Sequence, residues 1–360
     1  MSAPVLKSFY SHSITAPRLR RTNFQNHLLS AWYSSYNRCN KQVECDCMSY
    51  QKTVETIPST NHLYNVHIYI YTPKTKPRYM LQITHGMCEY LERYEPFIRY
   101  MTSKGVLVAG HDHAGHGNSI RTMEDLGYFS KDPYDLTLVK DLKNVSDLLA
   151  ERYSHLPHFI LGHSMGSFML RKYLMKYGRS LSGIFISGTG GTNKGIGPGI
   201  TLAKSIAAIK GDTHRSSLYN SIFFQGFNKN FKEENDEFSW LSRDKKIRDA
   251  YRKDPKCNFV FTLNAFKGFL TIMKDVTHEN WADTVPKDVP YHLFSGKEDP
   301  VGAYGKGVQE TYERLLEAKV KEVTLTLYEG GRHEMLNETN KKEVYENLFK
   351  RMEEMIKDRS

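Results

Sequence analysis

A pentapeptide of the form G-x-S-x-G, residues 162–166, lies between a predicted strand and a predicted helix. No other feature restricts the fold of this chain as much. An apolar run, residues 159–161, precedes it, and residues 167–174 follow it with helical spacing. In such a strand-turn-helix the serine hydroxyl is exposed at the tip, and the flanking glycines avoid collisions with the neighbouring strand and helix. Ser164 is therefore the candidate nucleophile, and the alternative is an ordinary glycine-serine turn.

Strand-like and helix-like segments alternate on both sides of this motif. The apolar and alternating runs predict strands over residues 65–72, 79–84, 106–110, 183–187, 290–295 and 323–328, and amphipathic spacing predicts helices over about 90–105, 136–153, 302–318 and 341–356. Regular alternation of this kind indicates an α/β protein. We therefore expect a mostly parallel central sheet with helices on both faces.

The alternation stops between residues 188 and 281. This segment contains a glycine-rich link, an apolar helical pattern near residues 201–209, and no strand pattern. It also carries many aromatic side chains: Phe223, Phe224, Phe227, Phe231, Phe238 and Trp240. We predict that residues 188–281 form a helical cap over a core made of residues 51–187 and 282–360.

Residues 1–50 lack sustained periodicity and form a predicted N-terminal extension. Residues 1–43 hold six Lys or Arg side chains and no Asp or Glu, a composition typical of an organelle transit peptide. The alternatives are a disordered extension or a wrongly assigned start of the chain. With no apolar run long enough to cross a bilayer, we expect a cytoplasmic protein, or an organellar one if the extension is a transit peptide.

The formal net charge of +10 invites a comparison with nucleic-acid-binding proteins. Because the first 43 residues carry six of these charges, only +4 remains for the rest of the chain. That part contains no recognisable nucleic-acid-binding motif, so we expect no nucleic-acid partner. No feature of the sequence specifies an oligomeric state.

A serine hydroxyl becomes an effective nucleophile only with a histidine base and an acid that orients the histidine. In folds of this kind the acid and then the histidine follow the serine, on loops after the last strands. Asp299 follows the predicted strand 290–295, and His333 follows the final strand. Glu298 is a rival acid, although we favour Asp299. His163 is adjacent to the nucleophile and is expected to point away from it and to pack.

Attack of a serine on a carbonyl group creates an oxyanion, which backbone N–H groups stabilise by about 3 to 4 kcal/mol each. One such N–H group is expected from Met165, the residue after the nucleophile. The other is expected from Met87, in the loop of residues 85–88 that follows the strand 79–84. The alternative for this loop is a plain turn at the end of a strand.

Two groups of residues have some features of metal sites. Cys39, Cys45 and Cys47 are close in sequence, but neither a second cysteine pair nor matching histidines accompany them. Residues 111–116 contain the His-x-His-x-x-His pattern of metallo-β-lactamase-like hydrolases, which carry Asp at the position of Gly115. We therefore expect no metal and no cofactor. The odd count of five cysteines also argues against a fold held together by disulfides.

Four separated motifs, taken in order, resemble the monoacylglycerol lipase and lysophospholipase-like branch of the serine α/β-hydrolases. They are residues 85–94 (HGMCEYLERY), residues 112–119 (DHAGHGNS), residues 162–167 (GHSMGS), and Asp299 together with residues 331–338 (GRHEMLNE). The resemblance extends from about residue 50 to the C-terminus and has no counterpart for the first fifty residues.

This resemblance implies the α/β-hydrolase fold and a catalytic triad of Ser164, Asp299 and His333. It also implies that the histidine-rich loop is a structural turn rather than a metal site. The chain departs from the family at Met87 and Cys88, where small residues are common, and at Ala114, which replaces a frequent arginine. The resemblance therefore does not specify the shape of the pocket near the oxyanion hole.

We predict a serine hydrolase that cleaves carboxylic esters of lipid-like substrates, monoacylglycerol or lysophospholipid, through an acyl-enzyme on Ser164. An apolar, aromatic cap suits the burial of an acyl chain, and weak contact of the cap with a membrane surface is a hypothesis. One alternative is a carboxylesterase or thioesterase that acts on a non-lipid acyl substrate. The other is a non-catalytic ligand-binding relative, although such proteins usually lose a member of the triad.

Overall fold

A computed structural model describes residues 50–134, 136–178 and 180–357. The predicted N-terminal extension, apart from Tyr50, and the three cysteines Cys39, Cys45 and Cys47 lie outside these residues. Within the described ranges, no helix has both the length and the apolar character needed to cross a bilayer. The cytoplasmic or organellar location stays a prediction.

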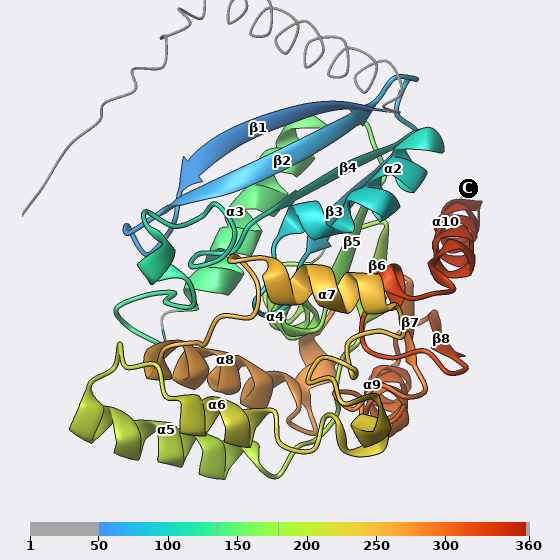
Figure 1. The fold of residues 1–360 in the computed structure, drawn as a ribbon. Coiled ribbons are helices and arrows are strands. Elements are labelled where there is room, and N and C mark those ends of the chain that lie inside the picture. Colours follow the sequence, from blue (N-terminus) through green and yellow to red (C-terminus); the bar gives the residue numbers. More distant parts are fainter. Residues whose placement is uncertain (1–49, 135, 179, 358–360) are drawn as a thin grey trace, which may run out of the picture. The chain divides into compact units, whose positions relative to one another are not determined.

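An eight-stranded sheet forms the centre of the described chain (Figure 1). Its spatial order is β1-β2-β4-β3-β5-β6-β7-β8. The strands are β1 Tyr50–Pro58, β2 Asn65–Pro73, β3 Tyr79–Thr84, β4 Val106–His111, β5 His158–His163, β6 Gly183–Ser187, β7 Tyr291–Gly296 and β8 Val323–Tyr328. The pairs β1–β2 and β2–β4 are antiparallel, and all other neighbours are parallel. The predicted mostly parallel α/β sheet is confirmed.

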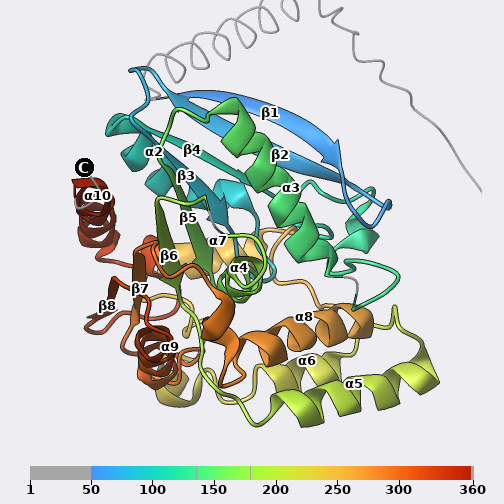
Figure 2. The same cartoon turned by 180° about the vertical axis from the view of Figure 1, so that it is seen from behind.

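Helices cover both faces of this sheet, which explains why every residue of β3 to β7 is buried. Helix α2, Glu95–Ser103, lies on one face, and α3, Thr137–Arg152, lies on the other with α4, Met165–Leu174 (Figures 1 and 2). The core is completed by α9, Lys306–Glu317, and α10, Lys341–Lys357, with short 3-10 turns at Leu91–Tyr94, Met123–Asp125 and Met335–Asn337. The four core helices predicted after residue 130, over residues 136–153, 167–174, 302–318 and 341–356, are therefore present as α3, α4, α9 and α10.

Strand β1 was not predicted. It pairs with β2 along its whole length at the edge of the sheet, and most of its side chains are exposed. An exposed edge strand lacks the alternation of apolar and polar residues that identifies a half-buried strand, and charged side chains such as Lys52 and Glu55 are common there. The first strand of the described chain therefore has no hydrophobic signature.

Between β6 and β7 the described chain forms helices and no strand. We call residues 188–281 the cap, as predicted from the sequence, and their status as a separate domain stays a prediction. The helices of the cap are α5 Ile196–Lys210, α6 Ser217–Phe223, η3 Lys229–Glu234, α7 Lys245–Lys253 and α8 Leu263–Val276, and η4 Trp281–Thr284 leads back to the core. Helix α8 packs against both α5 and α4. Because α4 begins directly after Ser164, the cap packs against the helix that follows the candidate nucleophile.

The buried side chain of Arg171, in α4, donates hydrogen bonds to both crossings, the two chain segments that connect the core and the cap. Its Nη1 donates to the carbonyl oxygen of Gly190 at 2.8 Å, where the chain leaves the core, and its Nη2 donates to that of Val276, where the chain returns. The ring of Trp281 lies 4.1 Å from the guanidinium carbon. Burial lowers the pKa of Arg171 to about 9, so the group is still charged at neutral pH.

Candidate active site

Ser164 occupies a strained turn between β5 and α4. Its backbone angles are φ 51° and ψ −122°, a region that non-glycine residues rarely adopt. A Cβ atom on Gly166 would lie 2.1 Å from the carbonyl oxygen of Thr84, and one on Gly162 would lie 2.6 Å from that of Gly166. Only glycine therefore fits at these two positions of the G-x-S-x-G motif, and the turn holds the serine at the end of its strand.

Three loops meet here, each at the carboxyl end of a parallel strand. Ser164 follows β5, Asp299 follows β7 and His333 follows β8. The Nε2 atom of His333 lies 2.8 Å from Oγ of Ser164, and its Nδ1 atom lies 3.0 Å from both carboxylate oxygens of Asp299. Asp299 also accepts hydrogen bonds from Ser295 Oγ at 3.0 Å and from the Val301 amide at 2.9 Å. With Nδ1–H donating to Asp299, Nε2 is left to accept the proton of the serine hydroxyl.

The charges at this site are those that a serine nucleophile needs. Burial alone would raise the pKa of Asp299, but the charge and the hydrogen bond of His333, with the bond from Ser295, lower it. Burial alone would lower the pKa of His333, but the charge and the hydrogen bond of Asp299, with the charge of Glu334, raise it above 6.5. An ionised carboxylate thus faces an imidazole of increased basicity.

The two rival residues have other positions. The side chain of Glu298 is 47% exposed, and its carboxylate lies 4.0 Å from Nε of Arg332. His163 is buried with its Nδ1 atom 3.2 Å from the hydroxyl of Ser187, and burial together with the charge of His333 lowers its pKa to about 3. A neutral, buried His163 suits the packing role expected from the sequence.

The predicted oxyanion loop lies directly against the serine. A Cβ atom on Gly86 would lie 3.1 Å from Cβ of Ser164, and Met87 lines the cavity in front of the serine. Met165 is the first residue of α4, so its amide has no acceptor within the helix and lies at the positive end of the helix dipole. Both predicted amides therefore belong to segments next to the nucleophile.

The histidine-rich loop, residues 111–116, packs against the loop of residues 85–88, which is predicted to bind the oxyanion. The rings of His85 and His113 lie 3.9 Å apart, and the amide of His113 donates to Nε2 of His85 at 3.0 Å. Burial lowers the pKa of His113 to about 4 and that of His116 to about 3, so both are neutral. Among the described residues, no three or more His, Cys, Asp or Glu side chains are placed to hold a metal ion. Asp112 caps the turn by accepting bonds from the amides of Leu91 and Asn118.

One buried charge network was not assigned a role from the sequence. Arg93 lies between two buried carboxylates: its Nη1 atom is 2.6 Å from Glu89, and its Nη1 and Nη2 atoms are each 2.9 Å from Glu334. Glu89 also accepts from the amide of Gly86, and Glu334 follows His333 in the chain. Burial raises the pKa of Glu89, whereas the charge of Arg93 lowers that of Glu334 in spite of burial. The network joins the loop of residues 85–88 to the loop that carries His333.

A cavity of about 700 Å³ opens in front of Ser164 and His333. The cap supplies most of its apolar wall, including Ile196, Leu202, Phe223, Phe224, Phe269 and Met273. Polar and charged side chains line the same cavity, among them Glu89, Lys194, Tyr251, Lys306, Glu310 and Glu334. An apolar wall combined with polar groups is typical of a site for an amphipathic ligand.

A strained serine after a parallel strand, hydrogen-bonded to a histidine and an aspartate on later strand ends, defines a serine hydrolase of the α/β-hydrolase fold. Over residues 75–340 the chain matches the Hydrolase_4 family, serine aminopeptidase S33, and it belongs to this family.

Several of the relatives that the chain matches are named monoacylglycerol or monoglyceride lipases. The chain is 25% identical to a monoacylglycerol lipase of Mycolicibacterium smegmatis over 283 residues, which cover 78% of this chain and 89% of the relative. It is 26% identical to the human monoglyceride lipase over 298 residues, which cover 79% and 86% of the two chains.

The fold is also found in solved structures. A thermostable carboxyl esterase from Bacillus coagulans, determined in complex with glycerol, has a TM-score of 0.79 and 28% identity, covering 85% of this chain and 99% of that one. The monoglyceride lipase of Saccharomyces cerevisiae has a TM-score of 0.66 at 17% identity, with 85% and 96% coverage, and shares the fold.

Proposed function

We propose that this chain is a carboxylic ester hydrolase that acts on lipid-like esters with a medium or long acyl chain. The observation that carries the proposal is the hydrogen-bonded series Ser164, His333 and Asp299 at the mouth of a largely apolar cavity. The names of the monoacylglycerol lipase relatives support the same substrate class. Since all three side chains of the series are present and in contact, a purely ligand-binding role is disfavoured.

In the proposed reaction, Ser164 Oγ attacks the ester carbonyl carbon while His333 Nε2 accepts the hydroxyl proton. The amides of Met87 and Met165 donate to the resulting oxyanion, and Asp299 stabilises the imidazolium. Collapse of the tetrahedral intermediate breaks the bond to the alcohol, which leaves with the proton from His333. Water, deprotonated by the same imidazole, then releases the fatty acid and restores the serine. No cofactor enters these steps.

The named relatives favour an uncharged alcohol, because they are monoacylglycerol or monoglyceride lipases. The charge of the cavity does not decide this choice: Glu89 and Glu334 line it and share the cation Arg93, but Lys194 and Lys306 line it as well. On the strength of the relatives we propose monoacylglycerol as the substrate in preference to lysophospholipid.

A series of nitrophenyl esters, together with a monoacylglycerol and a lysophosphatidylcholine of equal chain length, tests this proposal. Each methylene buried against the cap contributes about 0.8 kcal/mol, so kcat/KM is expected to rise at least about tenfold from acetate to octanoate. Monoacylglycerol should be cleaved faster than the lysophospholipid. A preference for acetate esters, for acyl thioesters or for aminoacyl nitroanilides would instead identify a carboxylesterase, a thioesterase or an aminopeptidase.

Weak contact between the cap and a membrane surface is a further part of the proposal. Helices α5 and α6 expose several large apolar side chains, namely Leu202, Ile209, Leu218 and Ile222. Ile209 is 81% exposed and Leu218 is 66% exposed. Sedimentation with phospholipid vesicles should carry down part of the protein, and the double substitution Ile209→Ser with Leu218→Ser should abolish this. Absence of vesicle binding by the unaltered protein contradicts the idea.

A further inference from the structure

The loop that carries the candidate base is built directly on a segment of the cap, residues 239–242. The amide of His333 donates to the carbonyl oxygen of Trp240 at 3.3 Å, and that of Glu334 donates to the carbonyl oxygen of Leu241 at 2.8 Å. The indole of Trp240 also lies with its ring centre 5.1 Å from that of the His333 imidazole. The backbone position of the base therefore depends on where this cap segment lies.

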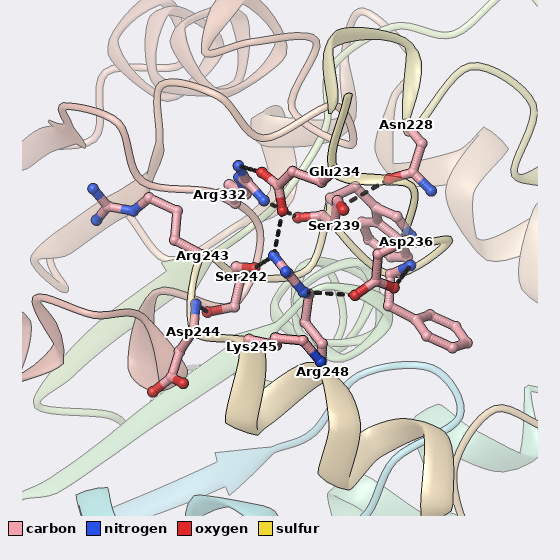
Figure 3. A network of polar contacts seen from close by, with 12 residues as sticks. Asn228, Glu234, Asp236, Ser239, Ser242, Arg243, Asp244, Lys245, Arg248 and Arg332 are labelled. Atoms are coloured by element: carbon pink, nitrogen blue, oxygen red, sulfur yellow. Dashed lines mark hydrogen bonds and ion pairs between the residues drawn. The ribbon is translucent and has the colours of Figure 1, made fainter. Parts of the chain in front are cut away.

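Two buried arginines bind the carbonyl groups of Ser239 and Ser242, the residues that flank Trp240 and Leu241 (Figure 3). Arg332, which precedes the base, donates from Nη1 to the oxygen of Ser239 at 2.7 Å. Arg248, in α7, donates from Nη1 to the oxygen of Ser242 at 2.9 Å. The arginines thus bind the first and last carbonyl groups of this four-residue segment. Its two middle carbonyl groups accept hydrogen bonds from the loop that carries His333.

One carboxylate joins the two arginines. Oε1 of Glu234 forms an ion pair with Arg332, and Oε2 lies 2.7 Å from Nη1 of Arg248 (Figure 3). Asp236 gives Arg248 a second partner at 2.9 Å from Nε, and the ring of Phe231 lies 4.1 Å from the guanidinium carbon of Arg332. The side chain of Glu234 is 33% exposed, so it neutralises the two buried cations from the surface. Without it, Arg248 would keep Asp236, whereas Arg332 would keep, among the described carboxylates, only Glu298 at 4.0 Å, and a buried charge without a close partner is unfavourable.

We propose that Glu234 is a positioning residue for hydrolysis. By holding Arg332 and Arg248 together, it fixes residues 239–242 and, through their carbonyl groups, the distance between His333 and Ser164. This inference rests on the proposed role of His333 as the base. It makes residues 228–252 of the cap a fixed part of the active site rather than a lid over it.

The test compares Glu234→Gln with Glu233→Gln in the full-length chain. Glutamine keeps the shape of Glu234 and removes its charge. Glu233 is exposed, as Glu234 is, but it is not paired with either arginine. The substrate is nitrophenyl acetate, whose short acyl group makes little use of the cap wall, with active sites counted by fluorophosphonate titration. We expect Glu234→Gln to lower kcat about tenfold with KM within about twofold, to slow phosphonylation of the serine to a similar degree, and Glu233→Gln to change neither.

Glu234→Asp separates charge from shape, since it keeps the carboxylate and shortens the side chain. If the charge fixes the arginines, Glu234→Asp is expected to retain more activity per active site than Glu234→Gln. Should Glu234→Gln fail to fold, Glu234→Asp carries the test alone, with a severalfold loss of kcat expected.

If Glu234→Gln keeps its kcat per active site and only its melting temperature falls, the positioning role is overturned. An equal loss of kcat in Glu233→Gln overturns it as well. An unaltered protein that neither hydrolyses esters nor reacts with the probe would instead refute the proposed function.

Discussion

Substitution of Ser164 by alanine is expected to abolish labelling by a fluorophosphonate probe and to lower kcat by about four to six orders of magnitude. Among the described residues, Ser164 is the only serine whose hydroxyl is hydrogen-bonded to His333, at 2.8 Å from Nε2. Residual turnover would come from the oxyanion-binding amides and from binding alone. Gel detection of the probe and ester hydrolysis measure the two effects independently.

Ser205→Ala is the matched control, because Ser205 is an exposed serine of α5 in the cap. It should label and hydrolyse like the unaltered protein. Unaltered protein that fails to label would refute the serine hydrolase mechanism, and equal labelling of Ser164→Ala would show that another residue is the nucleophile.

Substitution of Asp299 by asparagine is expected to lower kcat by about four orders of magnitude, since the imidazole then loses the partner that fixes its tautomer. It should also change the pH profile. His333 accepts a proton only when neutral, so activity is present above its pKa and is lost as the pH falls through it. Because Asp299 raises the pKa of His333 above 6.5, removal of its charge should move the acidic limb of kcat/KM to lower pH.

Glu298→Gln provides the comparison for Asp299→Asn. This neighbouring acid does not face His333, so its loss should leave kcat within about twofold and the acidic limb where it was. A large loss in Glu298→Gln with a small one in Asp299→Asn would mean that the rival acid orients the base.

The central sheet and the chain order of the candidate site were predictable because their signals are local. An apolar run before Ser164, and loops with Asp299 and His333 directly after strand-like runs, mark the same edge of a parallel sheet. The structure brings these three side chains into one hydrogen-bonded series. Their catalytic roles stay predictions until the substitutions above are made.

The unpredicted features depend on contacts between distant parts of the chain. Strand β1 has no buried face, so its edge position is visible only once β2 is in place. Glu234, Arg248 and Arg332 have the composition of a solvated surface, and nothing local indicates that they meet around residues 239–242. Buried charges of this kind are recognisable only from the partners that neutralise them.

The side chain of Arg171 has a consequence for how proteins of this architecture change over evolutionary time. It holds the cap through the main-chain oxygens of Gly190 and Val276, groups that every type of amino acid carries. Sequence drift in the cap can therefore reshape the cavity without loss of this attachment, whereas one substitution at Arg171 removes it from both crossings at once. Substitutions in the cap can thus change the substrate preference while the two hydrogen bonds from Arg171 that hold the cap are kept.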